Sequence, residues 1–283
     1  MSTGAARKQK FGHKQIRQFR QGRVNARKYL AQQKRMQSVR SRRLQKKLDT
    51  AFRKDTRIIV GQIRSGLQPD YDSSIRRKEV EIYATVRAEI QRLFNTIVEI
   101  NDEKYDAVFN KQVDLGFGFN RQAAISAWMD EYMTTREIIF ANITQSMTRR
   151  IFNDLIELEA EGLGIDAVAR QISRKYLAVS RKRAALIART EIHNAAGYGQ
   201  HNYHKSLSTD LGVYMTKEWV ATADDRTRSA HAEMNGTKVG MDEPFMMPNG
   251  TEMQYTGDPA GGAANVINCR CAIVYIDPED EVT

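Results

Sequence analysis

Two long stretches without glycine or proline constrain the fold of this chain most strongly, residues 75–114 and 119–161. The first stretch carries apolar residues at alternating steps of three and four, and the second carries an apolar stripe from Ile125 to Leu158 that Arg136 interrupts. The first stripe consists of Tyr83, Val86, Ile90, Leu93, Ile97 and Ile100. Such heptad-like spacing predicts helices that pack alongside one another. The turn at 116–120 joins the two stretches, so we expect an antiparallel helical hairpin.

The positive charge of the chain is concentrated at its start. Residues 1–54 contain 18 Lys or Arg and one acid, Asp49, so the remainder of the +10 chain carries −7. The segment has no sustained apolar face, which predicts a basic arm that does not order by itself. Its cations suit an acidic partner such as DNA phosphates. The candidate contact residues are Arg17, Arg20, Arg23, Arg27, Lys28, Lys34, Arg35, Arg40, Arg42, Arg43, Lys46 and Lys47.

The pattern changes after Gly212, from helical periodicity to short alternating runs. Shorter helices are expected before it, at 55–67, 166–176 and 181–207. After it, Asn235-Gly236 and Asn249-Gly250 indicate hairpins, and 271–276 reads as a final strand. The predicted fold class is α+β: a long helical hairpin or bundle, followed by a small mixed or antiparallel β-containing domain.

This reading divides the chain into a basic arm (1–54), a long-helix region (55–180) and a C-terminal α+β domain (181–283). No run of eighteen apolar residues is present, so no membrane span is expected. The start of the chain is polar and basic and lacks the apolar run of a signal peptide. The two cysteines are one residue apart, a spacing that fits a disulfide poorly and favours a reduced setting.

His231, Cys269 and Cys271 form a candidate metal site, because Zn²⁺ prefers His nitrogen and Cys sulfur. A closed structural site needs four ligands, and the fourth would have to be Asp224, Asp225 or water. The alternative is that both cysteines are small buried apolar residues. Since the ligand set is incomplete, no cofactor is expected, and zinc is kept as the alternative.

A second candidate set combines acids and guanidinium groups around the predicted docking surface of helix 181–207. Arginine pairs with carboxylates in fixed geometry, so these groups are expected to join the helix to the sheet loops. The set consists of Arg189, Glu191, Asn194, Asp224, Asp225, Arg226, Arg228 and Arg270. The competing hypothesis is a metal-dependent hydrolase or nuclease that uses Glu191, Asp225 and His231, with Glu191 or His231 as general base. A plain nucleic-acid-binding protein acting through 1–54 is the third hypothesis.

In these residues the last third of the chain resembles the Mu F-like minor head protein family of tailed bacteriophages. The matching motifs, in order, are Ala188-Arg189-Thr190-Glu191 with Asn194, Trp219 with Asp225-Arg226-Thr227-Arg228 and His231, Asn235-Gly236, Pro244-Phe245, and Asn268-Cys269-Arg270-Cys271. The resemblance implies a non-enzymatic minor capsid protein that acts in head morphogenesis, DNA packaging or DNA ejection.

The resemblance also implies partners and a location. The expected partners are the portal protein, phage DNA through the basic arm, and scaffold or major capsid protein. The expected location is the virion, in the capsid interior or at the portal vertex, and the host cytoplasm during assembly. Many relatives have cysteines where this chain has Arg228 and His231, and often a histidine where Val266 stands. The resemblance therefore implies that Arg–Asp pairing replaces a metal here.

Overall fold

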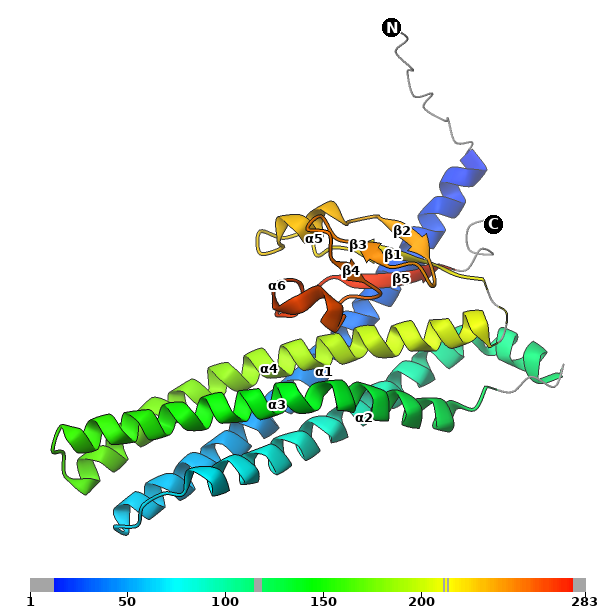
Figure 1. The fold of residues 1–283 in the computed structure, drawn as a ribbon. Helices are drawn as coiled ribbons and strands as arrows, with labels where there is room; N and C mark the ends of the chain where they lie inside the picture. The colour runs from blue at the N-terminus through cyan, green and yellow to red at the C-terminus, as the bar shows by residue number, and fades with distance from the viewer. Residues whose placement is uncertain (1–12, 115–118, 211, 213, 277–283) are drawn as a thin grey trace, which may run out of the picture.

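The computed structural model describes residues 13–114, 119–210, 212 and 214–276. For residues 13–27 and 107–114 it describes the backbone alone. Four long helices come first, followed by a small C-terminal region (Figure 1). The helices are α1 (His13–Arg64), α2 (Tyr71–Asp114), α3 (Arg121–Ala160) and α4 (Ile165–Thr209). The C-terminal region comprises β1 (Thr216–Val220), α5 (Ser229–Glu233), β2 (Lys238–Gly240), β3 (Phe245–Met246), β4 (Glu252–Met253), the 3₁₀ turn η1 (Pro259–Gly261), α6 (Gly262–Val266) and β5 (Ala272–Ile276). The predicted α+β class is confirmed.

The predicted pairing of two striped helices is confirmed in α2 and α3. The α2 stripe lies in the core, with Val86, Ile90, Leu93 and Ile97 fully buried. The facing residues of α3 include Trp128 and Tyr132, and the Phe94 ring of α2 meets both edge to face. Apolar residues three and four positions apart share one helix face, which is why each helix buries a continuous stripe. None of the described helices is long and apolar enough to cross a bilayer.

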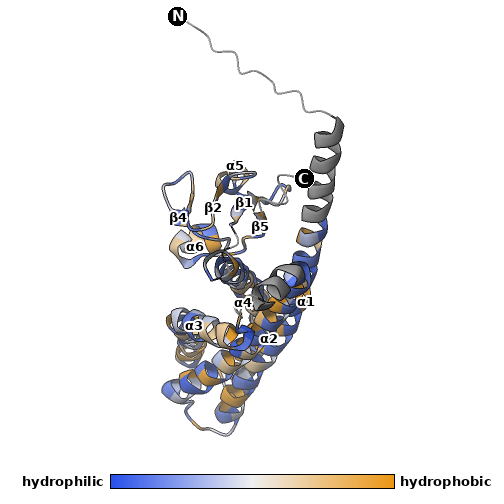
Figure 2. Ribbon diagram, turned by 90° about the vertical axis from the view of Figure 1, so that its right-hand side faces the viewer, coloured by the Kyte–Doolittle hydropathy of each residue, from blue (hydrophilic) through white to orange (hydrophobic). Residues whose placement is uncertain are grey.

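The prediction that residues 1–54 lack a sustained apolar face is wrong for the part whose side chains are described. These residues belong to α1, which continues without a break through 55–64, so no separate short helix exists there. Leu44, Leu48 and Phe52 are buried against the other helices. Their spacing of four residues places them on one face, and that face was hidden in the sequence by the many cations between them. Hydrophilic residues dominate the rest of the described α1 in Figure 2.

The two helices expected at 166–176 and 181–207 are one helix, α4. Ser180, just before the start expected for the second helix, lies inside α4 and donates to Asp49 Oδ1 of α1 at 3.0 Å. No glycine or proline lies between residues 165 and 196, so the helical hydrogen bonds continue across the expected break at 177–180. The predicted domain boundaries at residues 54 and 180 thus both fall inside continuous helices, whereas the division into three units stays a prediction.

The C-terminal region contains a three-stranded antiparallel sheet in the order β2-β1-β5 and a small β3-β4 hairpin. The hairpin predicted around Asn249-Gly250 is confirmed, with Gly250 at φ 79° in the turn. Asn235-Gly236 instead closes a longer connection between β1 and β2 that includes α5. Gly236 still makes the tight turn, at φ 83°, and its amide donates to the Trp219 carbonyl at 2.8 Å.

Two apolar cores support the described part of the chain. The main core runs from the bundle through α4 into the C-terminal region without interruption. A smaller core, around Ile59, Leu155 and Ile172, lies at the end of the bundle where α1 ends and α4 begins. In Figure 1, α4 lies between the C-terminal strands and the helices α2 and α3. Helix α4 therefore packs against both the other helices of the bundle and the C-terminal region.

Candidate functional site

The second half of α4 is enclosed on nearly all sides. Every residue from Thr190 to Ala196 is buried, whereas an ordinary surface helix buries one stripe. Small residues make this enclosure possible, including Ala188, Ala195 and Ala196, which are fully buried. Because alanine projects little beyond the backbone, neighbouring elements approach the helix closely from two directions.

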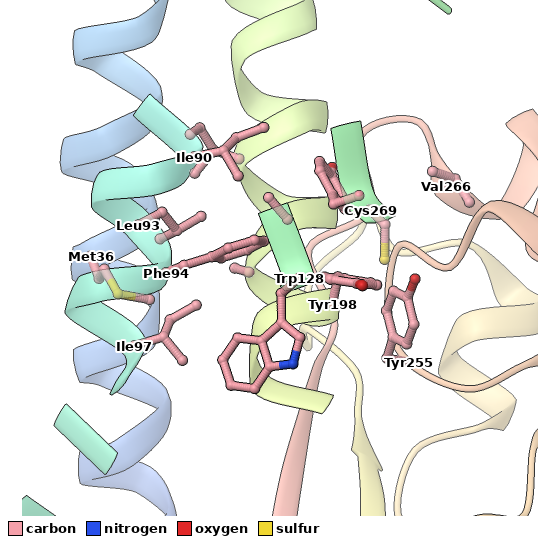
Figure 3. Packing of buried hydrophobic residues seen from close by; sticks show 14 of the residues in the cluster. Met36, Ile90, Leu93, Phe94, Ile97, Trp128, Tyr198, Tyr255, Val266 and Cys269 are labelled. Carbon is pink, nitrogen blue, oxygen red and sulfur yellow. The ribbon is translucent and has the colours of Figure 1, made fainter. Parts of the chain in front are cut away.

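Two glycines of α4 mark the closest approaches. A Cβ atom on Gly197 would lie 2.1 Å from the Thr256 carbonyl oxygen, and one on Gly199 would lie 2.9 Å from the Phe94 ring. Gly197 therefore faces the C-terminal region and Gly199 faces α2. Figure 3 shows the aromatic layer at this point, where Tyr198 lies between Phe94 and Tyr255. The loop at 255–257 and helix α2 thus pack closely against the same turn of α4.

Glu191 lies in this enclosed half and faces α3. Its carboxylate is 3.6 Å from the Arg136 guanidinium, and both side chains are at most 5% exposed. Burial raises the pKa of Glu191, while the Arg136 charge opposes that rise. The Arg136 guanidinium also lies 4.6 Å from the centre of the Tyr132 ring, a cation–π contact. The residue that interrupts the α3 stripe is thus the buried partner of Glu191, and sequence analysis left it out of the candidate set.

Four other charged residues of the set, Asp224, Arg226, Arg228 and Arg270, lie together at the surface of the C-terminal region. Arg270 pairs with both carboxylate oxygens of Asp224, one of them at 2.7 Å, and Arg226 lies 3.5 Å away. The hydrogen bonds from Arg270 hold the pKa of Asp224 well below its usual range. Arg228 donates to the Ile267 carbonyl. The predicted single cluster is therefore wrong in its pairing, since Glu191 pairs with α3 instead.

The remaining members of that set make no part of either ion pair. Arg189 and Asp225 are exposed. Asn194 is 1% exposed, and a Cβ on Gly257 would lie 2.5 Å from its side-chain oxygen. Gly257 has φ 86°, a conformation that glycine adopts without strain. Asn194 thus contributes to the tight contact between α4 and the loop at 255–257.

The candidate metal residues come together. The ligand atoms of His231, Cys269 and Cys271 lie within 4.8 Å of one another, and all three residues are buried. His231 Nδ1 is 3.6 Å from Cys269 Sγ and 3.4 Å from Cys271 Sγ. Hydrogen bonding with Cys269, together with His231, lowers the pKa of the Cys271 thiol, and the same bond raises that of Cys269. Within the described residues, this is the one such group of three or more His, Cys, Asp or Glu.

The order of residues along the chain explains how both sulfurs reach His231. Successive residues of an extended segment point to opposite sides, so residues 269 and 271 share a side. Arg270, between them, points the other way, toward Asp224. Asn268 adopts φ 57°, and the turn it makes directs the segment from α6 into β5.

The predicted basic arm is only partly described. Arg17, Arg20, Arg23 and Arg27 lie in α1, but their side chains fall outside the described residues. Two of the others are engaged inside the protein: Arg40 donates to Thr96 Oγ1 at 2.9 Å, and Lys47 pairs with Glu89 at 2.6 Å. The exposed remainder consists of Lys28, Lys34, Arg35, Arg42, Arg43 and Lys46. These cations occupy the side of α1 that the core leaves free.

Comparison with known proteins agrees with the sequence motifs. Residues 149–274 match the family model "Phage Mu protein F like protein". The chain is 31% identical over 130 residues to "Minor head protein GP7" of Bacillus phage SPP1, covering 44% of this chain and 41% of that protein. It is 26% identical over 225 residues to "NAD(+)--arginine ADP-ribosyltransferase EFV" of Enterococcus faecalis, covering 68% of this chain and 45% of that protein.

A third relative is the "Uncharacterized protein YqbB" of Bacillus subtilis, 29% identical over 97 residues, which cover 33% of this chain and 30% of that protein. The chain thus spans less than half the length of these curated relatives. No solved structure matches it. Residues 149–274, which contain the end of α3, all of α4 and nearly all of the C-terminal region, are thus similar to the Mu protein F-like family.

Proposed function

We propose that this protein is a minor head protein of a tailed bacteriophage and acts as a structural component in head morphogenesis. The observation that carries the proposal is the Mu F-like match over 149–274, together with the likeness to the minor head protein of phage SPP1. The test is to purify phage particles and procapsids and to quantify the chain by mass spectrometry. Its presence in few copies per particle is expected, and its absence from both kinds of particle contradicts the proposal.

The portal protein is the proposed partner, with scaffold or major capsid protein as alternatives. The enclosed half of α4 is committed to internal contacts, so a partner would use the outer surfaces of the bundle or of the C-terminal region. Co-expression of this chain with the portal protein, followed by affinity purification of the portal ring, tests the contact. Co-purification with the capsid protein alone would instead favour the capsid lattice.

DNA is the proposed second partner, through the exposed cations of α1. Six of the predicted contact residues are exposed on that helix, among them Lys34, Arg35 and Arg43. Binding driven by phosphate contacts must weaken steeply with salt, because it depends on counterion release. A salt series of DNA binding therefore tests this part. Binding that is independent of salt would exclude a phosphate-driven contact and the proposed role of α1 in packaging or ejection.

The hydrolase or nuclease alternative receives no support from the positions of its three residues. Glu191 pairs with Arg136 inside the protein, Asp225 is exposed, and His231 contacts the two cysteines. The likeness to an ADP-ribosyltransferase covers less than half of that protein. Assays of DNA hydrolysis with Mg²⁺ or Zn²⁺ separate the two hypotheses, and turnover above background that is lost in a Glu191→Gln variant would favour the enzyme.

A further inference from the structure

We propose that this protein binds one structural zinc ion through Cys269, Cys271, His231 and a fourth ligand that the sequence did not indicate, His193 of α4. The ion would tie the long helix to the start of the last strand. The proposal concerns the stability of the fold and stands independently of the proposed role in the phage head.

The distances within the three-residue cluster fit a tetrahedral ion. Zinc lies about 2.3 Å from sulfur and about 2.0–2.1 Å from nitrogen, which places a sulfur and a nitrogen ligand about 3.6 Å apart in a tetrahedron. The observed separations from His231 Nδ1 are 3.6 Å and 3.4 Å. The two nitrogen–sulfur separations are therefore those of zinc ligands, although His231 is in α5 and the cysteines are in the loop before β5, almost forty residues later.

The acids that were considered for the fourth position are otherwise engaged or misplaced. Asp224 binds Arg270 with both carboxylate oxygens, and Asp225 is exposed while the cluster is buried. Use of Asp224 would require breaking that bidentate pair. A further nitrogen ligand from the protein interior fits the buried position better, because a closed structural site has four protein ligands.

His193 has the hydrogen-bonding pattern of a histidine that binds a metal through Nε2. Its Nδ1 is 3.3 Å from Gln37 Oε1, and an amide oxygen only accepts, so Nδ1 carries the proton. Nε2 then presents a lone pair, and this buried atom has no hydrogen-bond partner among the described residues. His193 lies outside the group whose ligand atoms are within 4.8 Å of one another, so its ring would have to shift toward the other three ligands when the ion binds. Metal-bound histidines typically donate their second nitrogen to such a partner, the place that Gln37 takes here.

The first test is the metal content and affinity of the full-length protein. Elemental analysis after reconstitution with zinc and removal of excess is expected to give one ion per chain, which Cys269→Ser and Cys271→Ser abolish. His193→Gln should weaken zinc binding by about tenfold or more, and Gln37→Leu by about 10–100-fold. The matched control is His201→Gln, a buried histidine further along α4 whose pKa is not influenced by the cluster.

A reconstituted wild-type chain without zinc would overturn the proposal, and so would zinc that persists in the cysteine variants. Equal affinities of His193→Gln and His201→Gln would remove His193 from the site and overturn the four-ligand assignment. Cobalt substitution of the same proteins reports the ligand set directly, because the thiolate-to-metal absorption can come only from the two cysteines of this chain. Its loss in either cysteine variant is expected, and its absence in the wild type contradicts the site.

A second measurement needs no variant and covers the case in which a substitution prevents folding. Bound zinc should protect Cys269 and Cys271 of the wild-type protein from iodoacetamide, and a chelator should remove that protection. Equal alkylation rates with and without the chelator, in protein loaded with excess zinc, would contradict the proposal.

Discussion

The two halves of α4 meet different surroundings, although they form one helix. In the first half, burial follows a single face with Val168, Ala169, Ile172 and Tyr176, and the small core there is apolar. In the second half, the bundle covers one side and the C-terminal region the other, so that Thr190 through Ala196 are buried without a gap. Enclosure from two sides leaves polar residues such as Glu191 no route to solvent, and they must find partners inside.

The two halves place different demands on the sequence, although both lie within the family match at residues 149–274. A helix with one buried face needs only apolar residues at the right spacing, and many sequences satisfy that requirement. A helix enclosed on both sides also requires small residues where backbones approach and a partner for each buried charge. The second half of α4 meets these requirements with Gly197, where the Thr256 backbone approaches, and with the pairing of Glu191 and Arg136.

Acid should destabilise the enclosed half most. Burial lowers the pKa of His201 to about 3 and that of His204 to about 3, and α4 has no histidine before residue 193. The unfolded chain takes up these protons near pH 6.5, so the stability contribution is complete above that pH and is lost as pH falls toward 3. By pH 4 the loss is about 3 kcal/mol for each histidine.

Chemical denaturation at a series of pH values measures this effect, and His204→Gln should flatten the profile by one proton. The ring of His204 stacks on Tyr275 of β5 at 4.0 Å, so protonation should also loosen the contact between α4 and the sheet. Hydrogen exchange should show faster opening in the second half of α4 than in the first. A profile that is flat from pH 7 to 4 would refute the assignment of buried, neutral histidines.

Replacement of Glu191 by alanine should have the next largest effect. It leaves the Arg136 charge buried without its carboxylate, which costs about 3–5 kcal/mol. Asp130→Ala is the matched control, because Asp130 also pairs with an arginine, Arg87, but with 69% of its side chain exposed. Loss of that surface pair should cost less than about 1 kcal/mol. Equal destabilisation in the two variants, measured by urea unfolding, would contradict the expected difference between the buried and the exposed ion pair.

Gly197→Ala should destabilise the protein by about 1–3 kcal/mol, since the new methyl group meets the Thr256 backbone at 2.1 Å. The matched control is Gly61→Ala, in an exposed part of α1 where no atom lies within 4 Å of the added carbon. That change should be neutral or stabilise the protein by up to about 1 kcal/mol, because alanine favours the helix. Thermal unfolding of both variants measures the difference, and a harmless Gly197→Ala would show that the loop at 255–257 moves away easily.

Substitutions on the free side of α1 should change stability least. Replacing Lys34, Arg35 and Arg43 by glutamine is expected to shift the free energy of unfolding by no more than about 0.5 kcal/mol per residue. The same variant should bind DNA more weakly and with a smaller salt slope. Substitution of Lys47, which pairs with the buried Glu89, is the contrasting control and should reduce stability. If the triple variant binds DNA as the wild type does, α1 is not the contact surface.

The sequence predicted the elements whose pattern is local. The stripes of α2 and α3, the turn at Asn249-Gly250 and the last strand all follow from spacing and turn residues. The cysteines and His231 could be proposed as neighbours because few residue types bind soft metals. Leu44, Leu48 and Phe52 were missed because the cations between them obscured a face that only the neighbouring helices define.

Partners distant in sequence could not be predicted in the same way. Arg136 stood out in the α3 stripe, but nothing in the sequence indicated that Glu191, more than fifty residues later, would face it. Conversely, the sequence suggested that Glu191 and Asp224 act together, because both lie in one dense stretch. Sheet register and helix docking assign them to opposite sides of α4, and no local pattern encodes that choice.

The most direct test of the account is the substitution Glu191→Gln, measured for both thermal stability and DNA hydrolysis. Glutamine keeps the shape of the side chain and removes the charge that opposes Arg136. We predict a clearly lower melting temperature and no DNA hydrolysis in either the variant or the wild type, because Glu191 holds α4 against α3. A variant that melts with the wild type, but lacks a hydrolytic activity that the wild type has, would contradict the structural role of Glu191.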